Sequence, residues 1–314
     1  MEIVRFTQIN KEEVLNIDFH LFIATSGYEK RSISLSEQGV IKSKTKIVFG
    51  FEENQNNKIR KQNDKYYKNS NFKYVITSGN TEEAIVEQIK NYIENECNES
   101  YLRIAIDYSS MTRIWYASII DFFNNYSFKK KIALYFLYSK AQFTPPPKTE
   151  NQNFFFEPIK GFSNLSIPNK PTALILGLGY EKRRAFSLKE YFDAEEVYVF
   201  LTDENSAPEF HKEVCSRNKE LISKLHSGYI FKYPLNDLSY TRKLLFDLCN
   251  QLLIDYRIVI APCGPKPFTL ISLVVASMLP NIDVWRISGN KGYDRVDRSP
   301  TGDILSLLIE YEDI

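Results

Sequence analysis

The chain has 314 residues, a length that suggests about two domains, each large enough to bury a core of its own. Hydrophobic residues make up 43% and charged residues 25%, an ordinary globular composition that excludes a disordered or fibrous protein. Forty Lys and Arg against 39 Asp and Glu leave a net charge of +1, which argues against bulk electrostatic binding of duplex nucleic acid.

The sequence contains no apolar stretch that approaches the roughly 20 residues of a membrane-spanning helix, and its start lacks the apolar core of a signal peptide. The cysteines are widely separated and form no CxxC pair, and the three histidines are scattered. We therefore expect a reduced, cytoplasmic protein with no structural metal, no cofactor and no membrane partner. Neither a dinucleotide-binding GxGxxG motif nor a P-loop is present.

In the first half of the chain, β-rich apolar runs alternate with helical patterns. Residues 1–18 suggest an edge strand or a cap, and the polar, lysine-rich stretch 54–71 suggests a solvated helix or loop. The runs predict strands at 20–25, 46–51, 72–77, 102–106 and 131–138, and helices at 29–38, 81–96 and 113–123. A further strand at 153–158 can return antiparallel to the one at 131–138 across the three prolines at 145–147.

The second half repeats this plan after a linker at 161–170. Strands are expected at 173–178, 196–202, 228–233, 256–261 and 282–288, with a closing strand at 304–311. Strands that alternate with helices at this spacing indicate βαβ units and a mostly parallel sheet. The fold class predicted is α/β, with two tandem Rossmann-like domains at 1–160 and 171–314.

A repeated pentapeptide supports an internal duplication. Gly-Tyr-Glu-Lys-Arg occurs at residues 27–31 and again at 179–183, an offset of 152 (179 minus 27), and each copy follows an apolar run. Other landmarks keep nearly this spacing, with offsets of 151 (204 minus 53) and 154 (260 minus 106). We therefore expect two related halves, arranged about a pseudo-two-fold axis.

Ligands of open α/β sheets bind at the carboxyl ends of the strands, so the loops after strands one and four are the candidate site in each half. Gly27 and Gly179 allow close approach of a ligand to the backbone, and the first half offers hydroxyls at 109, 110 and 112. The second half offers the amides and the cation of Gly264-Pro265-Lys266 at a helix start. These residue types fit a phosphate-bearing ligand.

Each of these features also has a structural explanation. The glycines can be turn formers, and the cations of the pentapeptide can be surface charges, although their place in a first helical turn makes a compensating anion plausible. Tyr28 and Tyr180 can stack on a base or pack in the core. Asp107, which is replaced by Ala261 in the second half, can act in acid/base chemistry or cap the next helix, and the cap is favoured. Ser26 can cap the helix expected at 29–38.

The loops resemble those of the CRISPR-associated Rossmann fold (CARF) family. The resemblance is carried by Thr25-Ser26-Gly27, Ser109-Ser110-Met111-Thr112-Arg113, Gly177-Leu178-Gly179 and Cys263-Gly264-Pro265-Lys266. It implies that the loops hold a cyclic or linear oligonucleotide messenger across a two-fold interface. Most members carry one such domain and a fused effector, whereas this chain shows two copies and no room for an effector after Tyr311.

The leading hypothesis is a sensor in antiviral defence that binds a nucleotide or oligonucleotide messenger in the cleft between the halves. The candidate ligand-binding residues are Ser26, Gly27, Tyr28, Glu29, Arg31, Asp107, Ser109, Ser110, Thr112, Arg113, Gly177, Gly179, Tyr180, Glu181, Arg183, Cys263, Gly264 and Lys266.

Two alternatives stay open. The first is a metal-independent phosphodiesterase, similar to ring nucleases, in which Lys266, Arg113 and Ser110 hold the scissile phosphate and Glu29, Asp107 or Glu181 serve as acid/base groups. The second is a scaffold without ligand binding that serves a partner protein, such as an effector.

Overall fold

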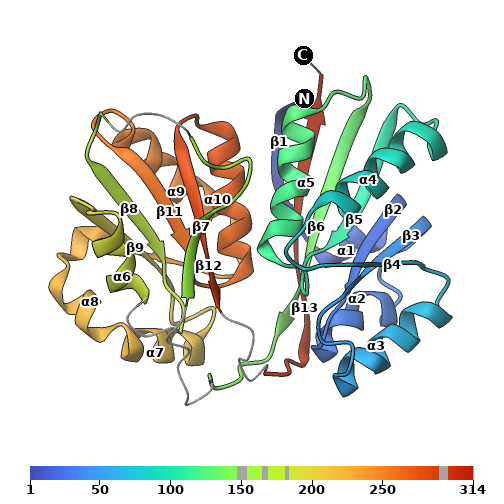
Figure 1. Cartoon of the computed structure of the whole chain (residues 1–314), viewed down its shortest axis with the longest axis horizontal. Coiled ribbons are helices and arrows are strands. Elements are labelled where there is room, and N and C mark those ends of the chain that lie inside the picture. Colours follow the sequence, from blue (N-terminus) through green and yellow to red (C-terminus); the bar gives the residue numbers. More distant parts are fainter. Residues whose placement is uncertain (147–153, 165–168, 181–183, 290–295, 314) are drawn as a thin grey trace. The chain divides into compact units, whose positions relative to one another are not determined.

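The computed structural model describes residues 1–146, 154–164, 169–180, 184–289 and 296–313. It is an α/β structure with two mixed sheets in which most strands are parallel (Figure 1). The chain divides into two compact units. Unit 1 is Met1–Thr144 together with Arg295–Ile314, and unit 2 is Pro145–Asp294.

Unit 1 is built on a seven-stranded sheet in the order β1-β13-β6-β5-β2-β3-β4. Its strands are β1 (Glu2–Ile9), β2 (Asp18–Ser26), β3 (Lys42–Phe51), β4 (Lys73–Thr77), β5 (Tyr101–Asp107), β6 (Lys131–Ala141) and β13 (Pro300–Glu312). Strands β2 to β6 are parallel, while β13 is antiparallel to both β6 and β1. Residues 19–26 of β2 are all buried, because helices cover this central strand on both faces.

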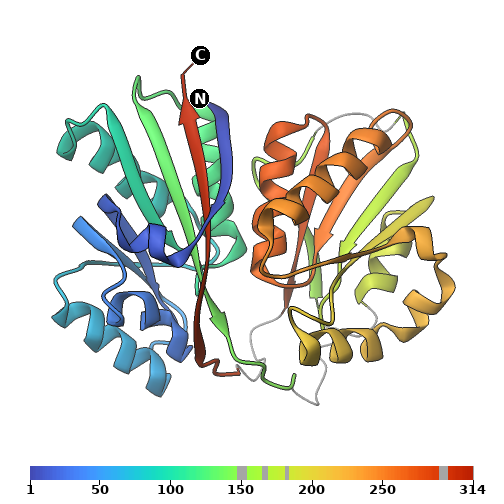
Figure 2. The same cartoon turned by 180° about the vertical axis from the view of Figure 1, so that it is seen from behind.

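The helices of unit 1 cover the two faces of this sheet (Figures 1 and 2). They are α1 (Lys11–Leu15), α2 (Ser34–Glu37), α3 (Lys58–Asn69), α4 (Glu83–Asn91) and α5 (Arg113–Asn125), with 3₁₀ turn η1 (Lys30–Ile33) and π-helical turn η2 (Tyr92–Glu96). Val14, Leu35 and Tyr67 of α1, α2 and α3 share one core cluster with Phe22 and Val48. On the opposite face, Trp115 of α5 stacks on Phe51, with ring centroids 4.4 Å apart.

Unit 2 has a six-stranded sheet in the order β10-β9-β8-β11-β12-β7. Its strands are β7 (Phe154–Pro158), β8 (Thr172–Gly177), β9 (Glu196–Thr202), β10 (Ile230–Tyr233), β11 (Arg257–Pro262) and β12 (Ile282–Gly289). Its helices are α6 (Arg184–Tyr191), α7 (Pro208–Arg217), α8 (Lys219–Lys224), α9 (Leu238–Leu252) and α10 (Lys266–Met278), with 3₁₀ turn η3 (Ser227–Tyr229). Helices α6 to α8 contribute to one core cluster, and α9 packs against α10.

The two sheets have the same parallel core. Counted along the chain, the five core strands are β2 to β6 in unit 1 and β8 to β12 in unit 2. In each unit the first, fourth and fifth core strands follow one another across the sheet, and the second and third lie on the other side of the first. An antiparallel strand flanks the fifth. This is a Rossmann-like order, 3-2-1-4-5, in which the winding reverses between the first and fourth strands. The edge strand near the start, β1, and the alternation of strands and helices in both halves confirm the sequence predictions.

The antiparallel strands correct the expected domain boundaries. Residues 153–158 were expected beside β6, but β7 pairs with β12 in unit 2, where Ile287 is opposite Phe156. Residues 304–311 were expected to close the second half, but β13 returns to unit 1 and lies between β6 and β1. Both strands contain short apolar runs that fit the edge of either sheet, and the choice between two edges depends on pairing far along the chain, which a local pattern does not encode.

Among the described residues, no helix is both long enough and apolar enough to span a bilayer.

Candidate functional site

The winding of unit 1 reverses between β2 and β5, which are neighbours in register, with Ile23 opposite Ile106. The loops that follow these strands meet. A Cβ atom added to Gly27 would lie 3.0 Å from Cβ of Ser110 and 3.2 Å from its Oγ. Gly27 therefore allows a close approach of the two loops, whereas the sequence analysis assigned this glycine to the approach of a ligand.

Side chains within unit 1 hold the loop after β2. The Ser32 hydroxyl accepts a hydrogen bond from the Gly27 amide (2.8 Å) and donates one to the Thr25 carbonyl (2.6 Å). The amide of Asn63, on α3, donates to the carbonyls of Gly27 (2.9 Å) and Glu29 (3.0 Å). This folding interrupts the helix predicted at 29–38, which is a 3₁₀ turn followed by the single turn α2.

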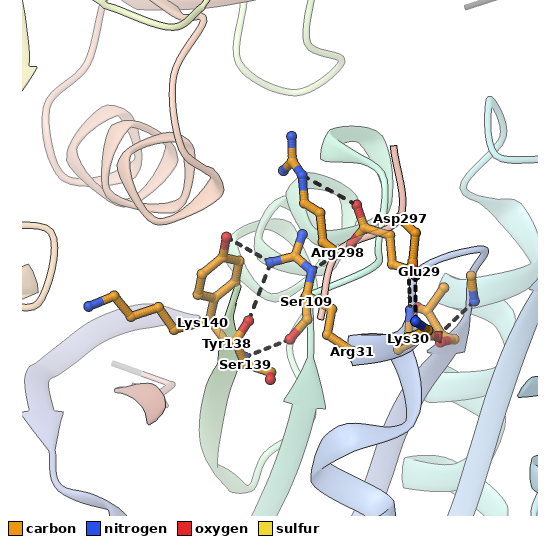
Figure 3. Close-up of polar contacts among 12 residues, drawn as sticks. Glu29, Lys30, Arg31, Ser109, Tyr138, Ser139, Lys140, Asp297 and Arg298 are labelled. Atoms are coloured by element: carbon orange, nitrogen blue, oxygen red, sulfur yellow. Dashed lines mark hydrogen bonds and ion pairs between the residues drawn. The ribbon is translucent and has the colours of Figure 1, made fainter. Parts of the chain in front are cut away.

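Arg31 is a buried part of this loop, with only 1% of its surface exposed. Its guanidinium donates to the Glu29 carboxylate (2.5 Å), to the Tyr138 hydroxyl (2.9 Å) and to the carbonyl of Ser139 (3.3 Å), as Figure 3 shows. Burial disfavours the charged form, but the interactions with Tyr138 and Glu29 outweigh it and raise the pKa of Arg31. Arg31 and Glu29 therefore stabilise the loop, and their groups are engaged within the protein.

The anion expected beside the cations of the first pentapeptide is a carboxylate of the same chain. Asp297 accepts a hydrogen bond from the Lys30 amide (2.9 Å) and lies 3.3 Å from its ammonium group (Figure 3). The next residue, Arg298, accepts a hydrogen bond from the Arg31 amide through its carbonyl (3.2 Å) and lies 3.9 Å from Glu29. The segment that leads into β13 thus packs along residues 29–31.

Helix α3 holds the same edge through a second buried cation. Arg60, 1% exposed, pairs with Asp64 (2.6 Å), and Asp64 also accepts hydrogen bonds from Ser26 (2.6 Å) and from the Tyr74 hydroxyl. Burial, followed by the bond to Asp64, raises the pKa of Tyr74. Ser26 is therefore a donor to α3 and does not cap the following helix, contrary to expectation. The polar stretch 54–71 was expected to be a solvated helix or loop, and its helix α3 is solvated on one side only.

Side chains of the loop after β5 also form hydrogen bonds within the protein. The Asp107 carboxylate accepts a hydrogen bond from the Ser109 amide (3.0 Å), and the Ser109 hydroxyl accepts one from the Ser139 amide (2.7 Å). The N-cap of α5 is Thr112, whose hydroxyl accepts from the Trp115 amide (3.3 Å). The prediction that Asp107 caps this helix is wrong, because Asp107 closes a tight turn five residues earlier.

Two buried hydroxyl groups near this point have no hydrogen-bond partner among the described residues, Ser110 Oγ and Thr25 Oγ1. Ser110 belongs to the loop before α5 and contacts the site of Gly27. Thr25 is opposite Phe49 in the sheet, and Phe49 packs on Trp115 in the first turn of α5 with centroids 6.2 Å apart. The Ser110 hydroxyl therefore lies close to the amino end of α5, where the helix dipole favours an anion, and Thr25 lies on the face of the sheet that Trp115 covers.

In unit 2 the corresponding loops also approach closely, with the roles of the residues exchanged. A Cβ atom on Gly264 would clash with the Leu178 carbonyl, so here the glycine lies in the loop after the fourth core strand. The amide of Asn218 donates to the Gly179 carbonyl (3.0 Å), as Asn63 does to Gly27 in unit 1. A Cβ on Gly177 would meet the Phe268 ring.

The remaining candidates of unit 2 give a mixed picture. Tyr180 packs on Phe210 with ring centroids 4.7 Å apart, which favours the core-packing interpretation. The Cys263 thiol donates to the Ala261 carbonyl (3.5 Å). Lys266 is partly exposed and is the first residue of α10, as expected. Glu181 and Arg183 lie outside the described residues.

The structure therefore brings together some of the predicted residues. In unit 1, Gly27 and Ser110 touch, and Thr112 and Arg113 begin the adjacent helix. Tyr28 is partly exposed next to Gly27. Of the three residues proposed for catalysis, Ser110 and Arg113 belong to unit 1 and Lys266 belongs to unit 2.

Sequence reasoning missed the side chains that support the loop from α3, β6 and the segment before β13. They are Arg60, Asn63, Asp64, Tyr67, Tyr138, Asp297 and Arg298. One signal was available for Asn63. It stands 155 residues before Asn218 (218 minus 63), close to the offset of the pentapeptide.

In the part of the chain that the structure describes, no cluster of three or more His, Cys, Asp or Glu side chains is arranged to bind a metal ion. The chain matches no known family model and no curated protein sequence.

Proposed function

We propose that unit 1 binds a phosphate-bearing ligand, a nucleotide or an oligonucleotide, at the carboxyl edge of its sheet between β2 and β5. The observation that carries this proposal is the buried Ser110 hydroxyl, which has no hydrogen-bond partner among the described residues although it lies against Gly27. A buried hydroxyl without a partner costs free energy, and a ligand oxygen would recover it.

The surroundings of Ser110 support an anionic ligand. Helix α5 has 13 residues, and the Thr112 cap uses the Trp115 amide. Its first residue, Arg113, is a cation that is partly exposed. A cation and a helix amino end next to a hydroxyl are the groups that hold phosphate oxygens in other α/β folds.

Binding is favoured over cleavage because the nearby carboxylates are engaged. Glu29 accepts from Arg31, and Asp107 accepts from the Ser109 amide, so neither is poised to take a proton from a ligand. The role that we propose is a sensor of a nucleotide or oligonucleotide messenger. The resemblance of the loops to the CARF family suggests antiviral defence as its setting.

We also propose that the two units arose by duplication and that unit 2 carries a second, diverged ligand site near Lys266. The shared strand order, the repeated pentapeptide and the paired roles of Asn63 and Asn218 support a common origin. The second site differs in its loop, where Cys263 takes the place of Ser109 and Gly264 that of Ser110.

The proposal is tested by binding of a panel of mononucleotides and of cyclic and linear oligonucleotides, measured by calorimetry and thermal shift, with product chromatography in parallel. A ligand that binds the native state raises the melting temperature and should be recovered intact. Ser110→Ala should weaken affinity by about 0.5–1.5 kcal/mol and Arg113→Ala by about 1.5–3 kcal/mol, the scales of a neutral and a charged hydrogen bond.

Ser216→Ala, at an exposed serine of unit 2, is the matched control and should bind as the wild type does. Unchanged affinity in both the Ser110 and Arg113 variants would refute the site. Recovery of shorter products in the presence of EDTA would favour the phosphodiesterase alternative instead. Lys266→Ala tests separately whether unit 2 binds the same ligand.

A further inference from the structure

Helix α3 has two faces of different character. Its inner face buries Arg60, Asn63 and Tyr67 against the sheet and the loop after β2. Its outer face carries four exposed lysines, Lys58, Lys61, Lys65 and Lys68. We call these four residues the lysine stripe.

The spacing of the stripe places its charges on one line. Intervals of three, four and three residues keep the four side chains within about 80° of arc along about 15 Å of helix. The other exposed residues of α3 are Gln62 and Asn69, so no acid interrupts the stripe. The single acid of the helix, Asp64, is bound to Arg60, Ser26 and Tyr74.

The stripe is unfavourable for the helix on its own. Neighbouring lysines three or four residues apart repel each other. Lys58 and Lys61 lie in the first turn, which contains no acidic residue, and there cations oppose the helix dipole. Among the described residues, none of the four lysines forms an ion pair, and Lys68 contacts the ring face of Tyr74, 5.0 Å from its centroid.

The corresponding region of unit 2 provides a comparison within the chain. Helix α7 contains Lys212 and Arg217 but also Glu209 and Glu213, so its formal charge is zero (+2 minus 2). Arg217 pairs with Glu213 at 2.5 Å. Helix α3 has a formal charge of +4, from four lysines and Arg60 against Asp64 (+5 minus 1). Of these two corresponding helices, only α3 is strongly basic.

We propose that the lysine stripe is a binding surface for the sugar-phosphate backbone of a nucleic acid strand. A strand carries one phosphate per about 3.4 Å of its axis, so a 15 Å stripe faces about four phosphates. A bound polyanion would remove the repulsion between the lysines. The apolar face of α3 is buried in the core, which disfavours insertion of this helix into a membrane surface.

The surface is distinct from the ligand site proposed at Ser110, and it stands whether or not that site binds a nucleotide. Lysine contacts to phosphates carry no sequence information, so the expected binding is weak in specificity and strong in salt dependence. The near-zero net charge of the whole chain is compatible with this, because the stripe is local.

The test is fluorescence anisotropy of the full chain with a labelled single-stranded RNA of 20 nucleotides at 50 and 200 mM NaCl. Four phosphate contacts predict a slope of about −2.8 in log affinity against log salt, a loss of about 50-fold between the two concentrations. In Lys58→Gln/Lys61→Gln/Lys65→Gln/Lys68→Gln, binding at 50 mM should fall at least tenfold and the slope should approach zero.

The matched control replaces four exposed lysines of unit 2 with Gln, at Lys189, Lys212, Lys219 and Lys243, and should keep both affinity and slope. Glutamine is a good helix former, and circular dichroism checks that the fold is retained. Equal RNA binding by the stripe variant and the wild type, or binding of anionic vesicles without RNA binding, would overturn the proposal.

Discussion

Units 1 and 2 share a scaffold but differ in what surrounds it. Both wind a parallel core in the order 3-2-1-4-5, and both tie the loop after the first core strand with an asparagine amide, Asn63 or Asn218. Unit 1 adds two buried arginines, Arg31 and Arg60, each with a carboxylate partner. Unit 2 keeps the contact that shapes the loop, but its described helix α7, which corresponds to α3, has balanced charges. The backbone constraint is thus common to both, whereas charges and hydroxyls distinguish unit 1.

The antiparallel strand beside the fifth core strand is also common to both units but is built differently in each. In unit 1 this strand is β13, from the end of the chain, and in unit 2 it is β7, which precedes the core. The position in the sheet is filled in both units, although the chain reaches it by different routes. The segment before β13 also brings Asp297 and Arg298 to the loop of unit 1.

The largest expected effect comes from breaking the buried ion pair of unit 1. Arg31→Ala leaves the buried Glu29 carboxylate with only the more distant Arg298, 3.9 Å away, and should cost about 3–5 kcal/mol of unfolding free energy. Hydrogen exchange followed by mass spectrometry should show faster exchange in β2 and β6, with unit 2 as the internal reference.

Lys30→Ala is the control for this change, because Lys30 is exposed and its ion pair with Asp297 is at the surface. It should cost less than about 1 kcal/mol. The double variant Glu29→Gln/Arg31→Met removes both charges and should cost less than Arg31→Ala alone. An Arg31→Ala protein as stable as the wild type would show that the pair does not hold the loop.

Substitution of Asn63 and of Asn218 tests whether the two asparagines play the same role in their units. Asn63→Ala leaves the carbonyls of Gly27 and Glu29 without this donor, whereas Asn218→Ala removes one such bond, to Gly179. Each should destabilise its own unit by about 1–3 kcal/mol, with Asn63→Ala the larger. Urea denaturation, with hydrogen exchange followed separately in each unit, measures the destabilisation in both variants. A loss in one unit and none in the other would mean that the two asparagines do not play the same role.

The smallest effect is a pH dependence of unit 1. His20 lies in β2, and its Nδ1 accepts the Arg103 amide at 3.0 Å. Burial, followed by the charges of Arg103 and Lys44, lowers the pKa of His20 from its usual 6.5. The unfolded chain therefore takes up this proton first, so the stability is fully present above pH 6.5 and is lost as pH falls through the lower folded pKa.

His20→Gln should flatten the loss of unit 1 stability between pH 7 and pH 5, measured by urea midpoints at each pH. The same curve in the variant and the wild type would assign the pH dependence to other groups.

The sequence was sufficient to predict the parallel core, because strands buried on both faces are continuous apolar runs such as Leu21–Ala24. It was also sufficient to predict that the loops of Gly27 and Ser110 lie at the same edge of the sheet, because both follow strands of the parallel core. It was not sufficient to predict the buried inner face of α3, because Arg60 and Asn63 have the same polar character as solvated residues although they are buried. The roles of Glu29 and Arg31 depend on Tyr138 and Arg298, which are more than 100 residues away along the chain.

The phosphate site between β2 and β5 is tested by hydrogen exchange of the whole chain with and without the tightest-binding cyclic or linear oligonucleotide of the panel. We expect slower exchange at residues 25–31 and 108–116 in the presence of that ligand, and loss of this protection in Ser110→Ala. Protection confined to other segments, or binding with no change at these two loops, would contradict a phosphate site between β2 and β5.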